Sequence, residues 1–320
     1  MAETSLIEWT DATWNPITGC SVVSPGCTNC YAMKLAGTRL KNHPSRAGLT
    51  QPSKAGPVWT GEVRLNEAWL ADPLKWTRPR RIFVCAHGDL FHEAVPDAWI
   101  AEIMGVMVAA VHLRGHVLQV LTKRGERAAQ LLSNEEFWAE ANAYASAEVM
   151  DRVDPLGRRT DDARATLDDY GPDEPPPGIW IGVSVEDQTR ADERCQDLAS
   201  LARHGWTTFV SYEPALGPVD WSGWEFLAWL ICGGENGPRP MHPDWARAAR
   251  GFCASAGIPF FFKQWGSWIP ADFASGTLVF LRADGSRGGW REEGAQEMWK
   301  AGKKNAGRRL DGIEHNGMPA

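Results

Sequence analysis

The chain has 320 residues, 43% of them hydrophobic, which is enough for one large domain such as an α/β barrel. Its 33 basic and 40 acidic residues give a net charge of −7, which excludes nucleic-acid binding through a uniformly basic surface but allows a local basic patch. The longest apolar run, 103–111, is far shorter than the roughly 20 residues of a membrane span. The N-terminus has no signal-peptide pattern. We therefore expect an intracellular protein without a membrane partner, located in the cytoplasm.

Short apolar runs alternate with helical stretches along the chain, as in a parallel β/α protein. The runs are continuously apolar, which suits strands buried on both faces. The predicted strands are one near Ile7–Trp14, then Arg81–Cys85, Val117–Leu121, Ile179–Val185, Thr208–Tyr212, Leu227–Cys232 and Pro259–Lys263. The predicted helices are Pro96–His112, Gly125–Leu132, Thr189–His204 and Asp244–Ala256. Six or seven β/α units favour an α/β fold with a parallel (β/α) barrel, full or partial.

Two segments depart from this alternation. Residues 133–178 are acidic and too long for a β/α connection, so we predict a helical insertion, which is either a lid over the strand ends or a solvated appendage. Residues 271–320 form a C-terminal extension whose tail, 300–309, holds five basic residues and no acidic one. This tail is a candidate phosphate-contacting patch or a solvated terminus. Residues 1–132 and 179–270 are then one discontinuous barrel domain that begins with a cysteine loop.

Seven cysteines are too few for a disulfide scaffold in a chain of this length. Three of them, Cys20, Cys27 and Cys30, lie within the segment TWNPITGCSVVSPGCTNCYA, directly after the first predicted strand. Glycines precede two of these cysteines, at Gly19 and Gly26, and allow the backbone to wrap around a ligand. Converging thiolates form a soft metal centre, so the segment predicts metal binding.

The number of cysteines bears on the identity of the metal. Structural zinc needs four protein ligands, and without a second Cys-x2-Cys pair the fourth would have to be His43 or His87. Three cysteines alone suit a four-iron cluster in which one iron stays open for chemistry.

Polar or reactive residues follow nearly every predicted strand. In parallel β/α folds this C-terminal strand edge is where binding sites are built. These residues are His87, Asp89, Thr122, Lys123, Glu186, Asp187, Glu213, Glu235, Asn236 and Gln264. Exposed loops also need polar residues, but the repetition of polar residues after successive strands along one sheet edge predicts a binding site.

A three-cysteine loop after the first strand of a parallel barrel resembles the radical S-adenosylmethionine (SAM) enzymes. The resemblance implies a [4Fe–4S] cluster bound by Cys20, Cys27 and Cys30, SAM at the open iron, reductive cleavage to a 5′-deoxyadenosyl radical, and an electron donor such as flavodoxin or ferredoxin. The usual spacing is Cys-x3-Cys-x2-Cys with an aromatic residue before the third cysteine. Here the first gap is six residues, Asn29 takes the aromatic position and Tyr31 follows the last cysteine. The Cys-x2-Cys-Tyr ending is similar to the spore photoproduct lyase branch, which acts on thymine dimers in DNA.

The whole chain is also similar to the phage- and prophage-associated three-cysteine proteins of unknown function. The matching segments run from end to end: TWNPITGC…GCTNCYA, HGDLFHE, LQVLTKR, IGVSVEDQ, SYEPALGP, LICGGENG, PFFFKQWG and AGRRLDG. Membership in this family does not by itself supply a reaction.

The radical SAM resemblance and the strand-end positions together nominate further site residues. Gly233, Gly234 and Glu235 are similar to the Gly-Gly-Glu element that holds the SAM amino group, although a tight turn is an alternative. The other cofactor-binding candidates are Tyr31, His87, Asp89, Lys123, Ser184, Glu186 and Glu213. The catalytic candidates are Cys85 and Cys232, as hydrogen-atom donors or as buried packing residues, and Lys263, which lies beside Gln264 and Trp265 where a base would be clamped.

The predicted function is that of a radical SAM-type iron–sulfur enzyme acting on a nucleic-acid base or nucleotide, in DNA repair or modification. The substrate class rests on the phage association, the lyase-like ending, the basic tail and an excess of tryptophan, which makes up 17 of the 32 aromatic residues. One alternative is a binding module braced by Cys3His zinc or by a cluster. The other is a metal-dependent nuclease or hydrolase that uses Asp89, Glu186, Glu213 and Glu235. The sequence has no P-loop, dinucleotide fingerprint, Gly-x-Ser-x-Gly elbow or His-Glu-x-x-His motif.

Overall fold

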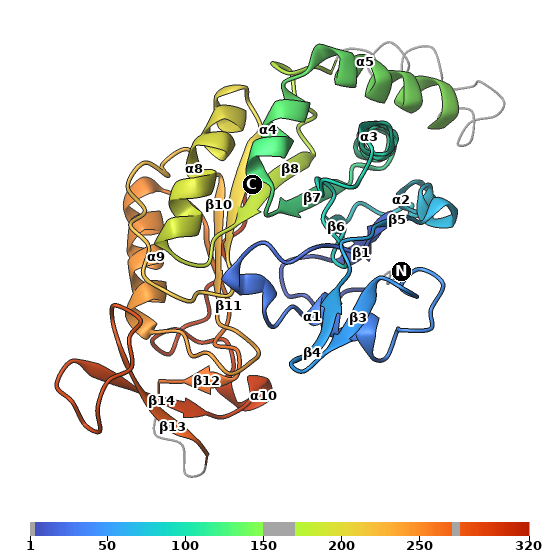
Figure 1. Ribbon diagram of the computed structural model, residues 1–320. Coiled ribbons are helices and arrows are strands. Elements are labelled where there is room, and N and C mark those ends of the chain that lie inside the picture. The colour runs from blue at the N-terminus through green and yellow to red at the C-terminus, as the bar shows by residue number, and fades with distance from the viewer. Residues whose placement is uncertain (1–3, 150–169, 271–275, 320) are drawn as a thin grey trace. The chain divides into compact units, whose positions relative to one another are not determined.

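The computed structural model describes residues 4–149, 170–270 and 276–319. Its largest sheet has seven strands in the order β1-β6-β7-β8-β9-β10-β11 (Figure 1). These strands are β1 (Ala12–Trp14), β6 (Arg81–Val84), β7 (Val117–Thr122), β8 (Ile179–Ser184), β9 (Thr207–Tyr212), β10 (Trp229–Gly233) and β11 (Phe260–Gln264). The pairs β1–β6, β6–β7, β9–β10 and β10–β11 are parallel. Every residue of β8 and of β10 is buried, as expected for parallel strands covered on both faces.

The chain is therefore a mixed α/β protein with the strand order of a partial (β/α) barrel, and the predicted fold class is confirmed. The two ends of the strand order, β1 and β11, are not neighbours in the part of the chain that the structure describes, which makes the barrel partial rather than full. The predicted strands are all present. The first begins at Ala12 instead of near Ile7, because Thr10 N donates to Ile7 O and closes a turn before it.

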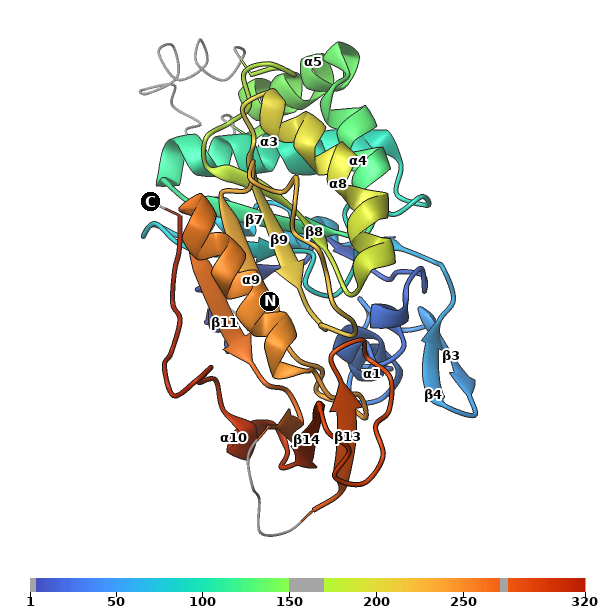
Figure 2. The same ribbon diagram turned by 90° about the vertical axis from the view of Figure 1, so that its left-hand side faces the viewer.

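Helices connect the strands of this sheet. They are α3 (Asp97–Arg114), α4 (Gly125–Leu132), α8 (Gln188–Arg203) and α9 (Pro243–Ala256), which confirm the four predicted helices (Figure 2). The α3 helix is mostly buried and ends at Gly115, whose φ of 64° is readily adopted by glycine. Proline at the first position of α9 follows His242, whose Nδ1 accepts a hydrogen bond from the Asp244 backbone N at 3.1 Å and caps the helix.

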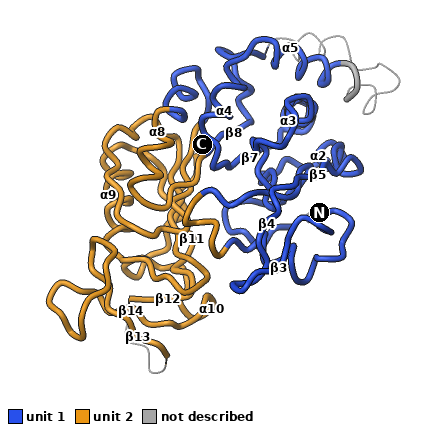
Figure 3. The backbone as a smooth tube through the Cα atoms, in the orientation of Figure 1, with its two compact units in different colours: residues 1–23, 30–182, 197–207 blue, residues 24–29, 183–196, 208–320 orange. Residues whose placement is uncertain are grey.

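The chain forms two compact units, shown in blue and orange in Figure 3. The first contains β1, β6, β7, the first four residues of β8 and the helices α3 and α4. The second contains most of β9, the strands β10 and β11, and helix α9. The described residues of the first unit fall within 1–23, 30–182 and 197–207, and those of the second within 24–29, 183–196 and 208–320. The predicted division into barrel, insertion and extension stays a prediction.

Short elements between β1 and β6 build a small layer of the first unit. Two antiparallel pairs occur there, β2 (Ile17–Thr18) with β5 (Arg64–Leu65) and β3 (Thr50–Ser53) with β4 (Gly56–Trp59). The helical elements are α1 (Tyr31–Gly37), the 3-10 turn η2 (Glu67–Trp69) and α2 (Asp72–Lys75). The sequence pattern did not predict them, because strands of two to four residues are too short to show periodicity.

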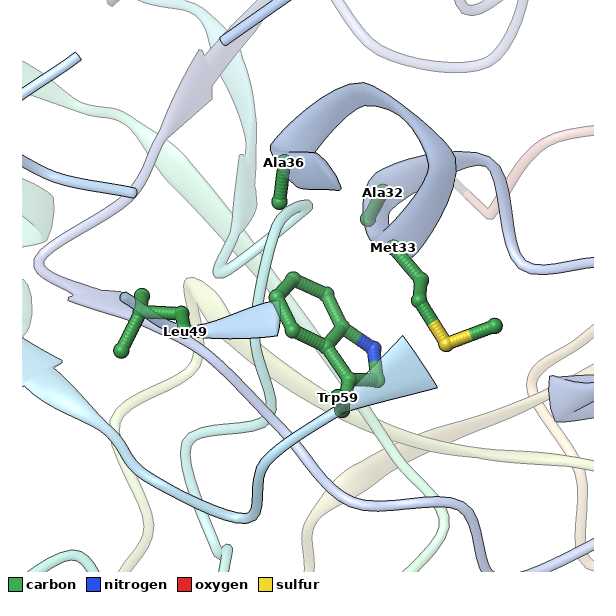
Figure 4. Close-up of a cluster of buried hydrophobic side chains, with 5 residues drawn as sticks. All are labelled: Ala32, Met33, Ala36, Leu49 and Trp59. Carbon is green, nitrogen blue, oxygen red and sulfur yellow. The ribbon is translucent and has the colours of Figure 1, made fainter. Parts of the chain in front are cut away.

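Helix α1 packs against the β3–β4 hairpin through a cluster of buried side chains, which we call the α1 cluster. Figure 4 shows the Trp59 ring and the Leu49 side chain next to the helix. The members of the α1 cluster are Ala32, Met33, Ala36, Leu49 and Trp59. Cys20 and Cys30 pack against this cluster.

The second unit ends in a separate antiparallel sheet of order β12-β14-β13. Its elements are β12 (Trp268–Ile269), β13 (Leu278–Arg282) and β14 (Ala295–Lys300), followed by the short helix α10 (Lys303–Ala306). The basic tail is therefore folded, with Lys303, Lys304 and Arg309 exposed.

The predicted insertion begins with α5 (Glu135–Ala143) and the π-helix η3 (Tyr144–Val149), so its first part is helical as expected. Residues 150–169 of the insertion lie outside the described residues. No helix in the described ranges is long and apolar enough to cross a membrane.

Candidate functional site

The cysteine segment starts at the edge of the sheet where β1 and β6 end. Gly19 N donates to His87 O at 3.2 Å, and Gly19 forms a parallel bridge with Gly88. Gly19 has a φ of +98°, and a Cβ there would lie 2.2 Å from the Glu62 carbonyl oxygen. Only glycine fits this position. The following residue, Cys20, therefore lies next to the C-terminal end of β6.

Two of the three cysteines of the segment, Cys20 and Cys30, pack against the same hydrophobic cluster. Cys20 and Cys30 are half-buried, and both pack against the α1 cluster. Cys30 stands at the start of α1, where its carbonyl accepts a hydrogen bond from Lys34 N at 3.1 Å. Neither cysteine is in a disulfide bond.

A buried guanidinium lies beside Cys20. Arg124 Nη1 is 3.4 Å from Cys20 Sγ and 3.0 Å from Asp89 Oδ2, Nη2 donates to Ser21 Oγ at 2.7 Å, and Nε donates to Glu93 Oε1 at 3.1 Å. The Arg124 side chain is only 6% exposed. A fixed cation at this distance favours the thiolate form of a cysteine, which is the form that binds metal.

Asp89 holds that guanidinium in place. Its carboxylate accepts hydrogen bonds from Thr122 Oγ1 at 2.6 Å and from the Lys123 backbone N at 3.1 Å. Burial alone would lower the pKa of Arg124, but the charges of Asp89 and Cys20 outweigh it and raise that pKa. Asp89 and Lys123 thus meet where β6 and β7 end, as their strand-end positions predicted.

Tyr31, His87 and a buried arginine form a second group in the first unit. Tyr31 Oη donates to Ala86 O at 2.6 Å, its ring is 50% exposed, and it stands 5.9 Å from the His87 ring. Arg46 Nη2 lies 2.9 Å from His87 Nδ1. Burial, together with the Arg46 charge, lowers the pKa of His87 to about 4. The imidazole is neutral at pH 7 and accepts from Arg46.

The third cysteine belongs to segment 24–29 of the second unit. Cys27 ends the 3-10 turn η1 (Pro25–Cys27) and is buried, with Ser24 Oγ 3.7 Å from its Sγ. Ser24 Oγ donates to Glu186 Oε1 at 2.6 Å, and Arg194 Nη1 donates to Glu186 Oε2 at 3.0 Å. The Glu186 side chain is fully buried. A Cβ on Gly26 would lie 2.4 Å from Glu186 Oε1, so the glycine permits this contact.

A second carboxylate holds the other end of segment 24–29. Asn29 Nδ2 donates to Glu235 Oε1 at 3.0 Å, and Arg239 Nε donates to the same oxygen at 3.1 Å. Arg239 Nη1 also donates to the Pro25 carbonyl at 3.0 Å. Glu186 and Glu235, both predicted to bind a cofactor, thus fix the backbone around Cys27.

Glu213, Lys263 and Gln264 meet at the ends of β9 and β11. Lys263 Nζ is 2.6 Å from Glu213 Oε2, and Gln264 Nε2 donates to Glu213 Oε1 at 3.1 Å. A Cβ on the nearby Gly233 would touch Glu213 at 3.5 Å, and one on Gly234 would lie 2.1 Å from the Trp265 carbonyl oxygen. Gly234 is therefore required for the close approach of two backbone segments, in agreement with the tight-turn alternative.

The two thiols proposed as hydrogen-atom donors are buried, one in each unit. Cys85 has a φ of 56°, a left-handed conformation that is uncommon for a residue with a Cβ. Burial raises the pKa of Cys85 to about 12, and burial followed by the charge of Glu213 raises that of Cys232 well above its usual range. Both stay protonated at neutral pH, and only the S–H form can donate a hydrogen atom.

The predicted site residues divide between the units. The first unit holds Cys20, Cys30, Tyr31, Cys85, His87, Asp89 and Lys123, and the second holds Cys27, Ser184, Glu186, Glu213, Cys232, Gly233, Gly234, Glu235 and Lys263. Ser184 is buried, and its carbonyl accepts from Arg194 Nη1 at 2.5 Å. The assignment of these residues to cofactor binding and catalysis stays a prediction.

Each of the four carboxylates considered for a divalent metal site has its own cation. The pairs are Asp89 with Arg124, Glu186 with Arg194, Glu213 with Lys263 and Glu235 with Arg239. Divalent ions of nucleases are bound by carboxylates whose charge is available to the metal, so these pairs do not favour the nuclease alternative. Within residues 4–149, 170–270 and 276–319, no group of three or more His, Cys, Asp or Glu side chains is placed to hold a metal ion. The donor chemistry of the cysteine segment, three cysteines outside disulfides with a cation beside one of them, nevertheless suits an iron–sulfur cluster.

Sequence reasoning missed the arginines of this site. Arg124, Arg194, Arg239 and Arg46 were not predicted, although Arg124 is the second residue after the strand β7 and directly follows the predicted Lys123. A strand-end position was the available signal for Arg124. Nothing in the pattern separates a buried arginine from a solvated one until its carboxylate partner is known.

The family model described as "Protein of unknown function (DUF5131)" matches residues 4–319 of the chain. Among solved structures, the chain is similar to a spore photoproduct lyase mutant with bound AdoMet and dinucleoside spore photoproduct. That match has 11% sequence identity and a TM-score of 0.37, and covers 90% of this chain and 68% of that chain. No curated protein matches the sequence.

Proposed function

The chain belongs to the DUF5131 family of proteins of unknown function, and we propose that it is an iron–sulfur enzyme of the radical SAM type in which Cys20, Cys27 and Cys30 bind a [4Fe–4S] cluster. When bound, such a cluster supplies the electron that cleaves SAM to a 5′-deoxyadenosyl radical. The observation that carries the proposal is the arrangement of Cys20 and Cys30, two half-buried cysteines outside disulfides that pack against one hydrophobic cluster, with a buried guanidinium 3.4 Å from Cys20 Sγ.

The surroundings of Cys20 support a role for it as a charged ligand. A guanidinium that is 6% exposed and held by Asp89 can neither leave nor be screened by water, so it favours a sulfur that carries negative charge. A cysteine that only packed in the core would gain nothing from this neighbour. Hydrogen bonds to cluster sulfurs also set reduction potentials, so Arg124 is placed to tune the cluster.

The fastening of segment 24–29 supports a role for Cys27. The two buried carboxylates Glu186 and Glu235 hold the backbone on either side of Cys27 through Ser24 and Asn29. A metal site needs its ligands held by surrounding contacts that fix their orientation. Cys27 is three residues from Cys30 along the chain, so the spacing keeps the two thiols within reach of one cluster.

The substrate class we propose is a nucleic-acid base or nucleotide, modified or repaired by hydrogen abstraction, with a flavodoxin or ferredoxin as electron donor. Its support is the set of exposed basic side chains in the tail, Lys303, Lys304 and Arg309. The excess of tryptophan no longer supports it, because most of these rings are buried in the core, with Trp290 exposed at 72%. Cys85 and Cys232, kept protonated by burial, are the proposed hydrogen-atom donors.

The test is anaerobic reconstitution with iron and sulfide, followed by metal analysis, the absorbance spectrum and electron paramagnetic resonance of the reduced protein with and without SAM. We expect about four irons per chain, a signal that SAM perturbs, and release of 5′-deoxyadenosine. Cys20→Ser, Cys27→Ser and Cys30→Ser should each lose the iron. Cys195→Ser, at a half-buried free cysteine outside the segment, is the matched control for Cys20 and Cys30 and should keep it. Stoichiometric zinc without SAM binding, or iron retention in all three variants, would refute the proposal.

A further inference from the structure

The segment that contains the cysteine loop and the layer after it has a net charge opposite in sign to that of the rest of the chain. Between Asp11 and Glu62 the sequence contains no acidic residue, but it contains Lys34, Arg39, Lys41, Arg46 and Lys54. The five cations give the segment 12–61 a formal charge of +5. The chain as a whole has a net charge of −7, so all other residues together carry −12. The C-terminal tail, 300–309, carries the same formal charge of +5 over ten residues, so the chain has two basic segments.

Four of the five cations lie on the surface of the first unit. Lys34 is on α1, Arg39 and Lys41 are in the loop after it, and Lys54 is at the tip of the β3–β4 hairpin, and all four are exposed. Among the described residues, no carboxylate lies within ion-pair distance of Arg39, Lys41 or Lys54. The α1 cluster packs helix α1 against the hairpin (Figure 4), so Lys34 and Lys54 belong to elements of one packed layer.

The fifth cation, Arg46, is buried in the same unit. Arg46 is 5% exposed, its Nη1 donates to Ser45 Oγ, its Nη2 lies beside the neutral His87, and its guanidinium stands 5.8 Å from the centre of the Trp69 ring. Its Nε has no hydrogen-bond partner, and no described carboxylate pairs with it. Burial, together with the charge of Arg64, lowers the pKa of Arg46 to about 10, as expected for a cation without a compensating anion.

A buried cation with only neutral partners is costly and adds positive potential to the unit that contains it. A single phosphate group is recognised by donors that converge on one point, as in a bidentate arginine contact. The exposed cations here are instead distributed over a helix, a loop and a hairpin. Such a distribution fits a polyanion whose charges are spaced along a chain, and salt-dependent phosphate contacts dominate the affinity of proteins for nucleic acids.

We propose that residues 31–61, which directly follow Cys30, form a binding surface for the phosphates of a nucleic-acid strand. This inference deepens the substrate class of the proposed function and rests on it for its biological meaning. Its physical content is independent of the cluster, because backbone binding requires neither iron nor SAM. The surface would position a strand by its phosphates, whereas recognition of the base would belong to other residues.

The test measures binding of a fluorescein-labelled single-stranded 20-mer of DNA to the full chain by fluorescence anisotropy, at salt concentrations from 50 to 200 mM. The variant Lys34→Ala/Arg39→Ala/Lys41→Ala should bind more weakly, and the slope of log K against log salt should become shallower by about 2, since each lost phosphate contact on a single strand contributes about 0.7. Lys54→Glu, at the hairpin tip, should weaken binding in the same direction. All four positions are exposed, and circular dichroism checks the fold of each variant.

The matched control is Arg78→Ala/Arg287→Ala/Arg291→Ala, which removes the same charge from exposed positions outside residues 31–61 and should leave the slope unchanged. The proposal is overturned if the wild-type chain does not bind the 20-mer at 50 mM salt, if the first triple variant keeps the wild-type slope, or if the control triple lowers the slope equally. Binding with the expected slopes by a protein that cannot be loaded with iron would keep this proposal and refute the radical SAM function, so the two failures are distinguishable.

Discussion

Replacing Gly26 by alanine tests whether the buried Glu186 fixes the backbone beside Cys27. The added Cβ would lie 2.4 Å from Glu186 Oε1 and 2.7 Å from its Cγ, far inside any real contact distance. Glu186 cannot swing away freely, because it is fully buried and held by Ser24 Oγ at 2.6 Å and Arg194 Nη1 at 3.0 Å. The backbone at Gly26 is not left-handed, so alanine introduces a steric conflict without a conformational penalty of its own.

The magnitude follows from two terms. Overpacking of a buried contact costs about 1–3 kcal/mol, and loss of one hydrogen bond to the buried carboxylate costs about 1.5–3 kcal/mol. Gly26→Ala should therefore lower the free energy of unfolding by about 3–5 kcal/mol, a large share of the roughly 5–15 kcal/mol that stabilises a typical domain. It should also reduce the iron bound after reconstitution, since Cys27 would be displaced.

The assay is urea unfolding followed by tryptophan fluorescence. Gly251→Ala is the matched control, because a Cβ there meets nothing within 4 Å and the residue lies in helix α9. That substitution should stabilise the protein by about 0.5–1 kcal/mol. In a Glu186→Ala background, where the obstructing side chain is gone, Gly26→Ala should cost less than about 1 kcal/mol, which leaves a coupling of at least about 2 kcal/mol. Equal unfolding midpoints for Gly26→Ala and the wild type, or additive effects of the two substitutions, would refute the reasoning.

Three further predictions address the titratable groups of the first unit and the buried thiols. The pKa of His87 is about 4 in the folded chain and about 6.5 in the unfolded chain, so only the unfolded chain binds the proton between these values, and stability should fall as the pH drops from 6.5 to 4. His87→Gln should remove up to about 3 kcal/mol of that decrease, as measured by urea unfolding at several pH values, and an unchanged pH dependence would contradict this. Arg124→Met leaves the Asp89 carboxylate buried without its cation and should cost about 3–5 kcal/mol of stability, whereas a loss below about 1 kcal/mol would show that the pair is solvated. Burial raises the pKa values of Cys85 and Cys232, so both should resist iodoacetamide in the native protein at pH 8, and mass spectrometry showing rapid labelling of either would contradict the structure.

Local sequence patterns determined most of the sheet and its helices. Continuously apolar runs such as Ile179–Val185 can be satisfied only by burial on both faces, and the strand β8 has every residue buried. The cysteine spacing and the glycines before Cys20 and Cys27 are likewise local, and the geometry at Gly19 and Gly26 shows why only glycine fits. Short elements such as the β3–β4 hairpin were missed because two to four residues carry no period.

Only the tertiary structure decided which side chains meet. Arg124 lies 104 residues from Cys20 in the sequence, Ser24 lies 162 residues from Glu186, and Asn29 lies 206 residues from Glu235. A strand-end glutamate has the same sequence pattern whether it faces a ligand or holds a loop, and an arginine has the same pattern whether it is buried or solvated. The role of such a side chain depends on which opposite charge folding brings within about 3 Å of it in a site without water. Only in such a buried site does a missing partner cost several kcal/mol. The tertiary structure also decided that most tryptophans are core residues. It likewise showed that Arg46, in the acid-free segment 12–61, is buried without a carboxylate partner among the described residues.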